Sequence, residues 1–302
     1  MLQRKEASTI FLPKKLLEEK LLKFLEEDLG QSDVTTALLI PEGITVEAEV
    51  VAKEAGIIAG IEEALTLLET FHLEASALVS EGSKVDGKTV VLKIVGDART
   101  LLSIERTLLN LLSRMSGIAT ATNRLMEKVK QAGYKTRIAA TRKVAVGLEY
   151  FDKKAVLLGG GDPHRFHLDD LVLIKDNHLA IVGNLSEAVK KAKEKVSFTK
   201  KIEVEVTCAE EAVEAAKAGV DIIMLDNMKP KQISEALAML QKENLRGKVL
   251  VEASGGITEQ NILDYAATGV DIISLSEITD AVKSLDISLE VRKLKKPSKK
   301  RI

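Results

Sequence analysis

The chain has 302 residues, with 44 Lys and Arg against 45 Asp and Glu and a formal net charge of −1. The balanced charge and an aromatic content of 3% argue against a dedicated nucleic-acid binder, which needs a basic surface or stacking rings. The single cysteine, Cys208, excludes an internal disulfide and a cysteine-based zinc site. No apolar run approaches the roughly 18 residues of a membrane span, so we expect a soluble, cytoplasmic protein.

The first third of the chain mixes helical and strand patterns. Leucines and a phenylalanine at three- and four-residue spacings predict an amphipathic helix over residues 14–29, and a second helix is predicted near residues 61–71. Alternating apolar and polar residues predict strands over residues 44–53 and 88–95. This region has no cluster of catalytic side chains, and the mixture indicates an α+β domain.

A long helix is predicted over residues 99–131, with an apolar stripe along one face. Arg106, Asn110 and Arg114 follow one another at four-residue intervals on a different face. The spacing by itself favours a solvated face. The alternative is that one of the arginines meets an anionic ligand or a neighbouring subunit.

From residue 136 onward, short β-branched runs alternate with helical stretches, which is typical of parallel strands joined by helices. The sequence Gly-Val-Asp-Ile-Ile begins at Gly219 and again at Gly269, and this repeat favours the βα units of a (β/α) barrel. No GxGxxG motif follows an early strand, so a dinucleotide-binding sheet has little support. The predicted strands are 136–140, 171–174, 202–206, 221–225, 248–252 and 271–275.

Polar residues lie at the end of each of these six strands. Because the carboxyl ends of barrel strands form the active-site face, the whole set predicts the rim of an enzyme's active site. The residues are Thr141, Arg142 and Lys143, then Lys175, then Glu203 and Glu205, then Asp226 and Asn227, then Ser254, Gly255 and Gly256, and finally Ser274 and Ser276.

The predicted rim carries both negatively and positively charged side chains. Glu205 and Asp226 suit ribose hydroxyls, a partly hydrated Mg²⁺ or a developing cation, and the alternative is an internal salt bridge to nearby cations. Planar guanidinium groups and compact ammonium groups suit carboxylates and phosphates. The cationic candidates are Arg142, Lys143, His164, Arg165 and Lys175.

Glycine-rich segments enter the rim at two places. Residues 254–256, Ser-Gly-Gly, are a candidate phosphate cradle, because bare backbone N–H groups can approach oxygen atoms closely; an ordinary turn is the alternative. Residues 159–161 are three glycines that lead to His164 and Arg165, and a hydrogen-bonded structural histidine is the alternative for His164. Together these features indicate two anionic partners, one of them a ribose phosphate, and chemistry at the anomeric carbon.

Several motifs occur in a specific order along the chain: EDLG at 27–30, SDVTT at 32–36, ER at 105–106 with Asn110, TRK at 141–143, GGG at 159–161 with HR at 164–165, IKDNH at 174–178, EVEV at 203–206, LDN at 225–227 and SGG at 254–256. In this order they resemble the quinolinate phosphoribosyltransferase family over nearly the whole chain. The resemblance implies an N-terminal α/β sandwich domain over 1–115 and an open (β/α) barrel of fewer than eight strands over 116–280. A C-terminal segment over 281–302 would return to the first domain.

The resemblance also implies an activity. A carboxylating nicotinate-nucleotide diphosphorylase converts quinolinate and phosphoribosyl pyrophosphate into nicotinate mononucleotide, pyrophosphate and CO₂ in NAD biosynthesis, with Mg²⁺ carried by the phosphoribosyl pyrophosphate. Arg106 would enter the neighbouring subunit's site in a homodimer or a higher homo-oligomer, and neither nucleic acid nor membrane would be a partner. The implied catalytic residues are Lys143, Glu205 and Asp226, and the implied substrate-binding residues are these three together with Thr141, Arg142, His164, Arg165, Lys175, Ser254, Gly255, Gly256 and Ser276.

Three places depart from the family's usual motifs: Val144 to Val146 follow the TRK motif, Pro163 precedes the His-Arg pair, and Ser276-Glu277 follow the last strand. These departures leave two alternatives to the main hypothesis. One is a paralogous phosphoribosyltransferase with another substrate, and the other is a non-catalytic anion-binding barrel. The basic tail over residues 292–302 is expected to be a solvated, partly disordered terminus.

Overall fold

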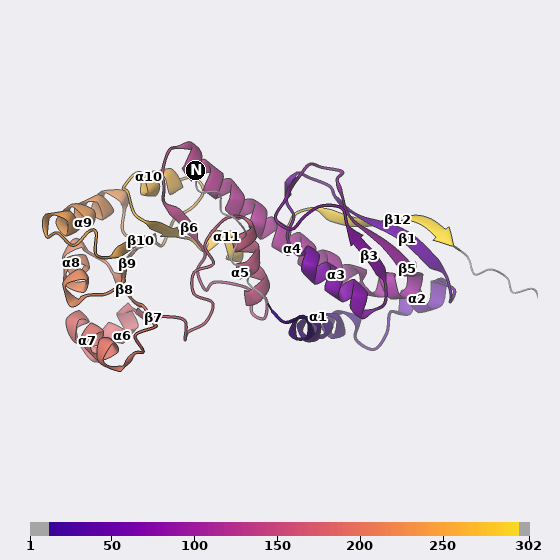
Figure 1. Cartoon of the computed structure of the whole chain (residues 1–302), viewed down its shortest axis with the longest axis horizontal. Helices are drawn as coiled ribbons and strands as arrows, with labels where there is room; N and C mark the ends of the chain where they lie inside the picture. The colour runs from indigo at the N-terminus through magenta and orange to yellow at the C-terminus, as the bar shows by residue number, and fades with distance from the viewer. Residues whose placement is uncertain (1–11, 296–302) are drawn as a thin grey trace, which may run out of the picture. The chain divides into compact units, whose positions relative to one another are not determined.

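The computed structural model describes residues 12–295 and contains two compact units (Figure 1). The first unit comprises Met1–Ala121, Leu157–Gly159 and Val282–Ile302, and the second comprises Thr122–Val156 and Gly160–Ala281. No helix among the described residues is both long enough and apolar enough to cross a membrane.

The first unit is built on a four-stranded antiparallel sheet in the order β12-β1-β5-β3. Its strands are β1 (Thr45–Ala52), β3 (Glu74–Ala77), β5 (Val90–Asp97) and β12 (Ile287–Lys295), and a short pair is formed by β2 (Gly56–Ile57) and β4 (Lys84–Val85). Its helices are α1 (Lys14–Leu29), α2 (Val34–Leu39), α3 (Ile61–Thr70) and α4 (Ala98–Gln131), of which α4 continues into the second unit.

The helical spacing in the sequence accounts for which faces of these helices are buried. In α1, Leu17, Leu21 and Leu25 are buried, as the predicted amphipathic pattern requires. The apolar stripe of α4 is also buried, whereas Arg106 and Asn110 on its other face are exposed.

The C-terminal strand β12 pairs antiparallel with β1, from Ala52 opposite Ile287 to Thr45 opposite Lys295. The expectation of a partly disordered tail from residue 292 was therefore wrong for residues 292–295, which form the end of this strand, although residues 292–294 are exposed as expected. The charged residues on β12 face charged partners on β1, because Arg292 binds Glu49 at 2.8 Å and Lys293 binds Glu47 at 3.2 Å. Residues 296–302 lie outside the described part of the chain.

The second unit is built on six parallel strands in the order β6-β11-β10-β9-β8-β7. The strands are β6 (Arg137–Ala139), β7 (Val172–Ile174), β8 (Ile202–Val206), β9 (Ile222–Asp226), β10 (Leu250–Ser254) and β11 (Ile272–Ser274). The helices are α5 (Glu149–Leu158), α6 (Asp176–Val182), α7 (Leu185–Lys195), α8 (Ala209–Ala218), α9 (Pro230–Lys242), α10 (Ile262–Ala266) and α11 (Glu277–Asp280).

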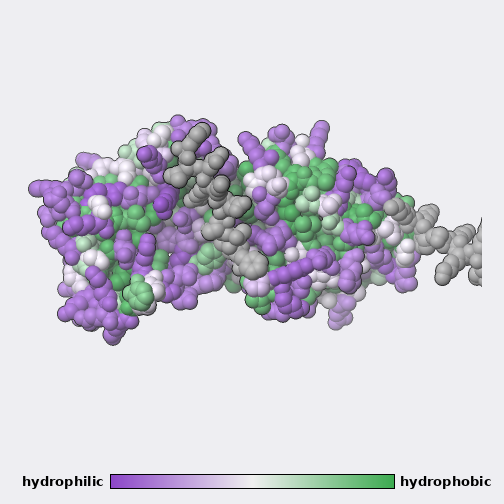
Figure 2. Space-filling model, viewed as in Figure 1, coloured by the Kyte–Doolittle hydropathy of each residue, from purple (hydrophilic) through white to green (hydrophobic). Residues whose placement is uncertain are grey.

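The fold-class prediction is confirmed. The first strand along the chain, β6, pairs with the last, β11, whereas β6 and β7 are the two edge strands and do not pair with each other. The result is an open barrel of six strands, and the strand centres are fully buried at Ile138, Val204, Ile223 and Val251. Hydrophilic residues cover much of the outer helices α7 to α9 on the face shown in Figure 2.

Candidate active site

A cavity of about 450 Å³ opens at the carboxyl ends of the six parallel strands. It is lined by every predicted site residue of the second unit: Thr141, Arg142, Lys143, His164, Arg165, Lys175, Glu205, Asp226, Ser254, Gly255, Gly256 and Ser276. Arg106 belongs to the first unit, where its side chain is exposed on α4. The tertiary structure thus gathers residues that are up to 135 positions apart, because parallel strands place all their carboxyl ends on one side.

The three consecutive glycines allow His164 and Arg165 to reach this rim. A Cβ on Gly161 would lie 2.6 Å from Thr122 Cγ2 and 3.0 Å from Val156 Cγ1, so only glycine allows this close packing. The next residue, Asp162, forms a parallel bridge with Ala139 of β6. The segment therefore runs along the open edge of the barrel like a further strand, and His164 and Arg165 follow at its carboxyl end.

Among the described residues, three cations in the cavity have no counter-ion. Within residues 12–295, no carboxylate lies within ion-pair distance of the Arg142, Lys143 or Arg165 side chain. Burial and, after it, the nearby Arg142 charge lower the pKa of Arg165, which shows that the cations are crowded together. An anion placed between them would relieve this repulsion, so the arrangement fits a ligand with carboxylate or phosphate groups.

The two predicted carboxylates have different surroundings. Glu205 is in contact with the ammonium group of Lys175, so the internal salt bridge considered as an alternative is present for this residue. Asp226 accepts a hydrogen bond of 2.9 Å from Asn227 Nδ2, and no cation of the described residues pairs with it. Asp226 therefore keeps an uncompensated negative charge at the rim.

His164 has both ring nitrogens directed at protein groups. Its Nδ1 accepts a hydrogen bond of 2.7 Å from the backbone N–H of Arg165, and its Nε2 lies 3.3 Å from Glu252 Oε2 and 3.6 Å from Glu203 Oε2. Burial by itself lowers the pKa of His164, but the two glutamate carboxylates raise it to about 10 and so favour the protonated ring, with a proton on Nε2. The N–H of Arg165 acts in the opposite sense at Nδ1, because it needs an unprotonated nitrogen as its acceptor.

Glu203 and Glu252 are both fully buried; Glu252 is part of the cavity lining, whereas Glu203 is not. Burial raises the pKa of Glu203, with the His164 contact acting against this. Glu252 accepts a hydrogen bond from Ser274, whose hydroxyl oxygen also lies 3.0 Å from Ser254 Oγ. A polar chain thus runs along the cavity lining from His164 through Glu252 and Ser274 to Ser254.

The Ser-Gly-Gly segment has the geometry of an anion cradle. Gly255 and Gly256 have φ values of +92° and +64°, and a Cβ on Gly255 would lie 2.4 Å from Asn227 Oδ1. The backbone N–H groups of both glycines donate to no acceptor within residues 12–295. Glu277 accepts a hydrogen bond from the backbone N–H of Glu259 at 3.1 Å and does not line the cavity.

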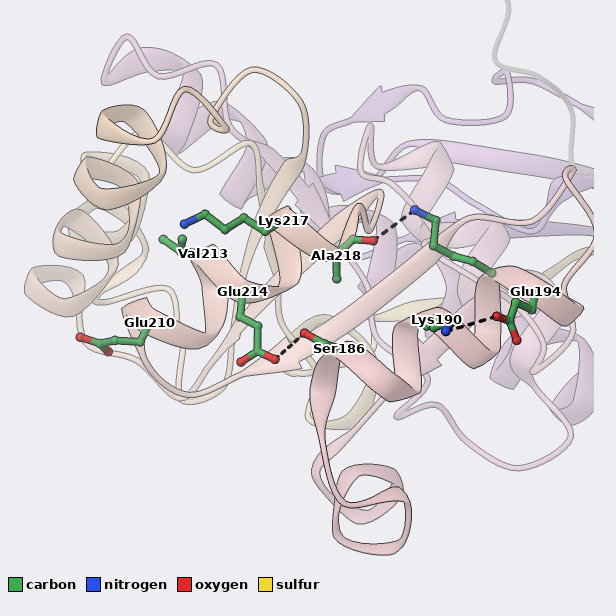
Figure 3. A pocket seen from close by; sticks show the side chains of 9 residues that line it. Ser186, Lys190, Glu194, Glu210, Val213, Glu214, Lys217 and Ala218 are labelled. Carbon is green, nitrogen blue, oxygen red and sulfur yellow. Dashed lines mark hydrogen bonds and ion pairs between the residues drawn. The ribbon is translucent and has the colours of Figure 1, made fainter.

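A hollow of about 780 Å³ on the outside of the barrel, between α7 and α8, differs in kind (Figure 3). All of its lysines are already paired with protein groups. Ser186 donates to Glu214 at 2.6 Å, Lys193 donates to the backbone oxygen of Ala218 at 3.1 Å, and Lys190 lies 4.0 Å from Glu194. This surface therefore has neither the unpaired cations nor the strand ends of the barrel cavity.

Comparisons with known proteins place the chain in a family. The family model for the N-terminal domain of quinolinate phosphoribosyl transferase matches residues 33–116, and the model for the C-terminal domain of the same family matches residues 118–290. The chain belongs to the quinolinate phosphoribosyltransferase family.

Relatives in this family match over most of their length. The probable carboxylating nicotinate-nucleotide pyrophosphorylase of Methanothermobacter thermautotrophicus is 47% identical over 90% of this chain and 98% of its own. The carboxylating nicotinate-nucleotide pyrophosphorylase of Rattus norvegicus is 36% identical over 95% and 94%. The solved structure of nicotinate-nucleotide pyrophosphorylase from Francisella tularensis aligns with a TM-score of 0.85 at 35% identity, covering 95% of this chain and 100% of that one.

Sequence reasoning missed the contacts that Glu203 and Glu252 make with His164. Strand periodicity carries a signal for both, because Glu203 lies two residues before Glu205 on β8 and Glu252 lies two residues before Ser254 on β10. Residues two apart share a face of a strand, so both glutamates point to the barrel interior, one layer below the rim. Lys153 was also missed, and nothing in its local sequence distinguishes it from the neighbouring Lys154.

Proposed function

We propose that this chain transfers the phosphoribosyl group of phosphoribosyl pyrophosphate to quinolinate, forming nicotinate mononucleotide, pyrophosphate and CO₂ for NAD biosynthesis. The observation that carries this proposal is the combination of unpaired Arg142, Lys143 and Arg165 with two carboxylates, Glu205 and Asp226, in one cavity. Membership of the quinolinate phosphoribosyltransferase family supports the same reaction.

The cationic side of the cavity would bind quinolinate. Its two adjacent carboxylates match two guanidinium groups, each of which can donate a pair of hydrogen bonds. Arg142 and Arg165 have this chemistry, and their mutual repulsion would fall when the dianion binds. His164 would contribute by holding Arg165, since both of its ring nitrogens have protein partners.

The opposite side would bind phosphoribosyl pyrophosphate. The backbone N–H groups of Gly255 and Gly256, with the hydroxyls of Ser254 and Ser276, would hold the 5′-phosphate. Lys143 would face the pyrophosphate and stabilise the charge that it gains on leaving.

The carboxylates suit the reacting ribose and its metal ion. Glu205 and Asp226 would hold ribose hydroxyls and stabilise the positive charge that develops as pyrophosphate leaves. Their oxygens also suit Mg²⁺, which keeps several waters and binds through one or two carboxylates together with phosphate oxygens. When bound, Mg²⁺ neutralises part of the pyrophosphate charge.

The reaction then follows from the positions of the two substrates. The pyridine nitrogen of quinolinate forms a bond to the anomeric carbon as the bond to pyrophosphate breaks, and the ring becomes cationic. The adjacent carboxylate leaves as CO₂, its bonding electrons remain on the ring carbon, and a proton replaces it. The negative charge of the leaving carboxylate and the positive charge of the ring cancel in this step, so a water-poor site favours it.

We further propose that the active form is a homodimer or a higher homo-oligomer in which Arg106 enters the neighbouring subunit's cavity. Arg106 is exposed on α4, and no carboxylate of the described residues pairs with it. Mixing an Arg106→Ala chain with an inactive Asp226→Asn chain tests this arrangement. Recovery of activity in the mixture is expected, because one site then receives both intact residues, and no recovery would contradict it.

The function itself is tested by incubating the protein with phosphoribosyl pyrophosphate, Mg²⁺ and either quinolinate or nicotinate. Equal amounts of pyrophosphate and CO₂ are expected with quinolinate, and neither with nicotinate. Pyrophosphate without CO₂ would indicate a different acceptor and a paralogous transferase. No product from folded protein would favour a binding protein without catalysis.

A further inference from the structure

A fully buried lysine lies behind the segment that carries His164 and Arg165. Lys153 on α5 has 0% relative exposure and does not line the cavity. Its ammonium group donates to the backbone oxygens of Pro163 and, at 3.0 Å, of Arg165, and it lies 5.9 Å from the centre of the Phe166 ring. Within residues 12–295, no carboxylate lies within ion-pair distance of it.

Such a position is costly for a charged group. An ammonium group buried without a counter-ion loses its hydration, and carbonyl oxygens replace water only in part. A structural role in packing alone would be met better by an apolar side chain of the same length. The cost indicates that the two hydrogen bonds are needed for another purpose.

The two carbonyls flank His164 on both sides. His164 has a φ of +54°, a left-handed conformation that residues other than glycine rarely adopt, and Lys153 holds the carbonyl oxygens of the residue before it and of the residue after it. Further hydrogen bonds stabilise the same turn, because the His164 N–H donates to Asp162 Oδ1 at 2.8 Å and the Arg165 N–H donates to His164 Nδ1. The turn fixes the direction in which Arg165 enters the cavity.

We propose that Lys153 is a positioning residue that holds the turn at 163–166 and thereby aims Arg165 at the carboxylates of the acceptor substrate. This inference rests on the proposed function for the identity of that substrate. It also explains how Pro163 is accommodated before the His-Arg pair: proline lacks an N–H, and the contact uses its carbonyl oxygen.

Lys153→Met tests the proposal, because methionine has a similar length and no donor. The KM for quinolinate should rise between about 10- and 100-fold, as expected for a misaligned binding group, while the KM for phosphoribosyl pyrophosphate should stay within about 2-fold. Lys153→Gln keeps a neutral N–H donor and should give a smaller rise. Lys193→Met is the matched control, because it removes a lysine-to-carbonyl hydrogen bond of the same unit between α7 and α8, and should change neither constant.

Hydrogen–deuterium exchange supplies a readout independent of activity. Amide hydrogens of residues 164–167 are all hydrogen-bonded to the side chains of Asp162, His164 or Asp170, and they should exchange at least about 10-fold faster in Lys153→Met than in wild type. Unchanged exchange, or an equal rise in both KM values, would overturn the positioning role. If wild-type protein shows no reaction with quinolinate, the proposed function fails, and the exchange rates still decide whether Lys153 holds the turn.

Discussion

The buried ammonium group of Lys153 predicts an unusual dependence of stability on pH. Burial lowers its pKa from 10.5 to about 8, with Glu149 and Asp162 acting against this and Arg142 and Arg165 adding to it. Between those two values the unfolded chain binds a proton that the folded chain has lost. The free energy of unfolding therefore rises with pH through this group, and the gain is lost as pH falls through about 8.

The size of the effect follows from the two pKa values. One pKa unit corresponds to about 1.36 kcal/mol, so the whole change amounts to about 3 kcal/mol. Only about 0.4 kcal/mol should be gained by pH 8, and about 2 kcal/mol by pH 9.5. Other groups titrate in this range, so the relevant quantity is the difference between wild type and Lys153→Met, which lacks the titrating group.

Urea unfolding followed by tyrosine fluorescence can measure this difference for the barrel unit. The chain has no tryptophan, and its three tyrosines, Tyr134, Tyr150 and Tyr265, all belong to the second unit. The free energy of unfolding of wild type should rise relative to Lys153→Met by about 2 kcal/mol between pH 7 and pH 9.5. Parallel pH profiles of the two proteins would refute the reasoning, because they would mean that Lys153 titrates as it does in the unfolded chain.

Three other substitutions test the site and the fold. Asp226→Asn removes the uncompensated carboxylate, and kcat with quinolinate should fall by about 100-fold or more with little change in thermal unfolding; a near-normal kcat would exclude charge stabilisation by this residue. In Gly255→Ala the new Cβ would lie 2.4 Å from Asn227 Oδ1 at a φ of +92°, so steady-state kinetics should show a KM for phosphoribosyl pyrophosphate raised by about 10-fold or more. An unchanged KM would argue against the phosphate cradle. In Gly117→Ala the Cβ would lie 2.4 Å from the backbone oxygen of Lys283, so calorimetry should show the first unit destabilised by about 1–3 kcal/mol. An unaltered unfolding transition would mean that the segment around Lys283 can move away from the new methyl group without loss of stability.

The strands and helices of the barrel unit could be predicted from the sequence because their signals are local. Each of the six predicted strands overlaps one strand of the parallel sheet, and the predicted helix at 14–29 has the same bounds as α1. Periodicity of apolar residues depends only on neighbours along the chain, and parallel strands place their ends on one side whatever their order. The gathering of Arg142, Glu205 and Asp226 in one cavity therefore followed from strand ends alone.

Contacts between distant parts of the chain were not predictable in this way. The strand β12 pairs with β1 across more than 230 residues. Its basic composition is typical of a solvated tail, and only the fold places acidic residues of β1 opposite its basic residues. Glu203, Glu252 and His164 come from three separate segments, and only the fold brings the two carboxylates close enough to raise the pKa of His164.

Lys153 shows the same limit at a single residue. In the sequence it is one of two adjacent lysines on a helix, and only folding places its ammonium group against Pro163 and Arg165. The sequence by itself determined the secondary structure, the barrel and the strand ends that carry the chemistry. The tertiary structure decided which charges are paired, which are buried and which remain available to a ligand, because those properties depend on desolvation and on distances between segments far apart in the chain.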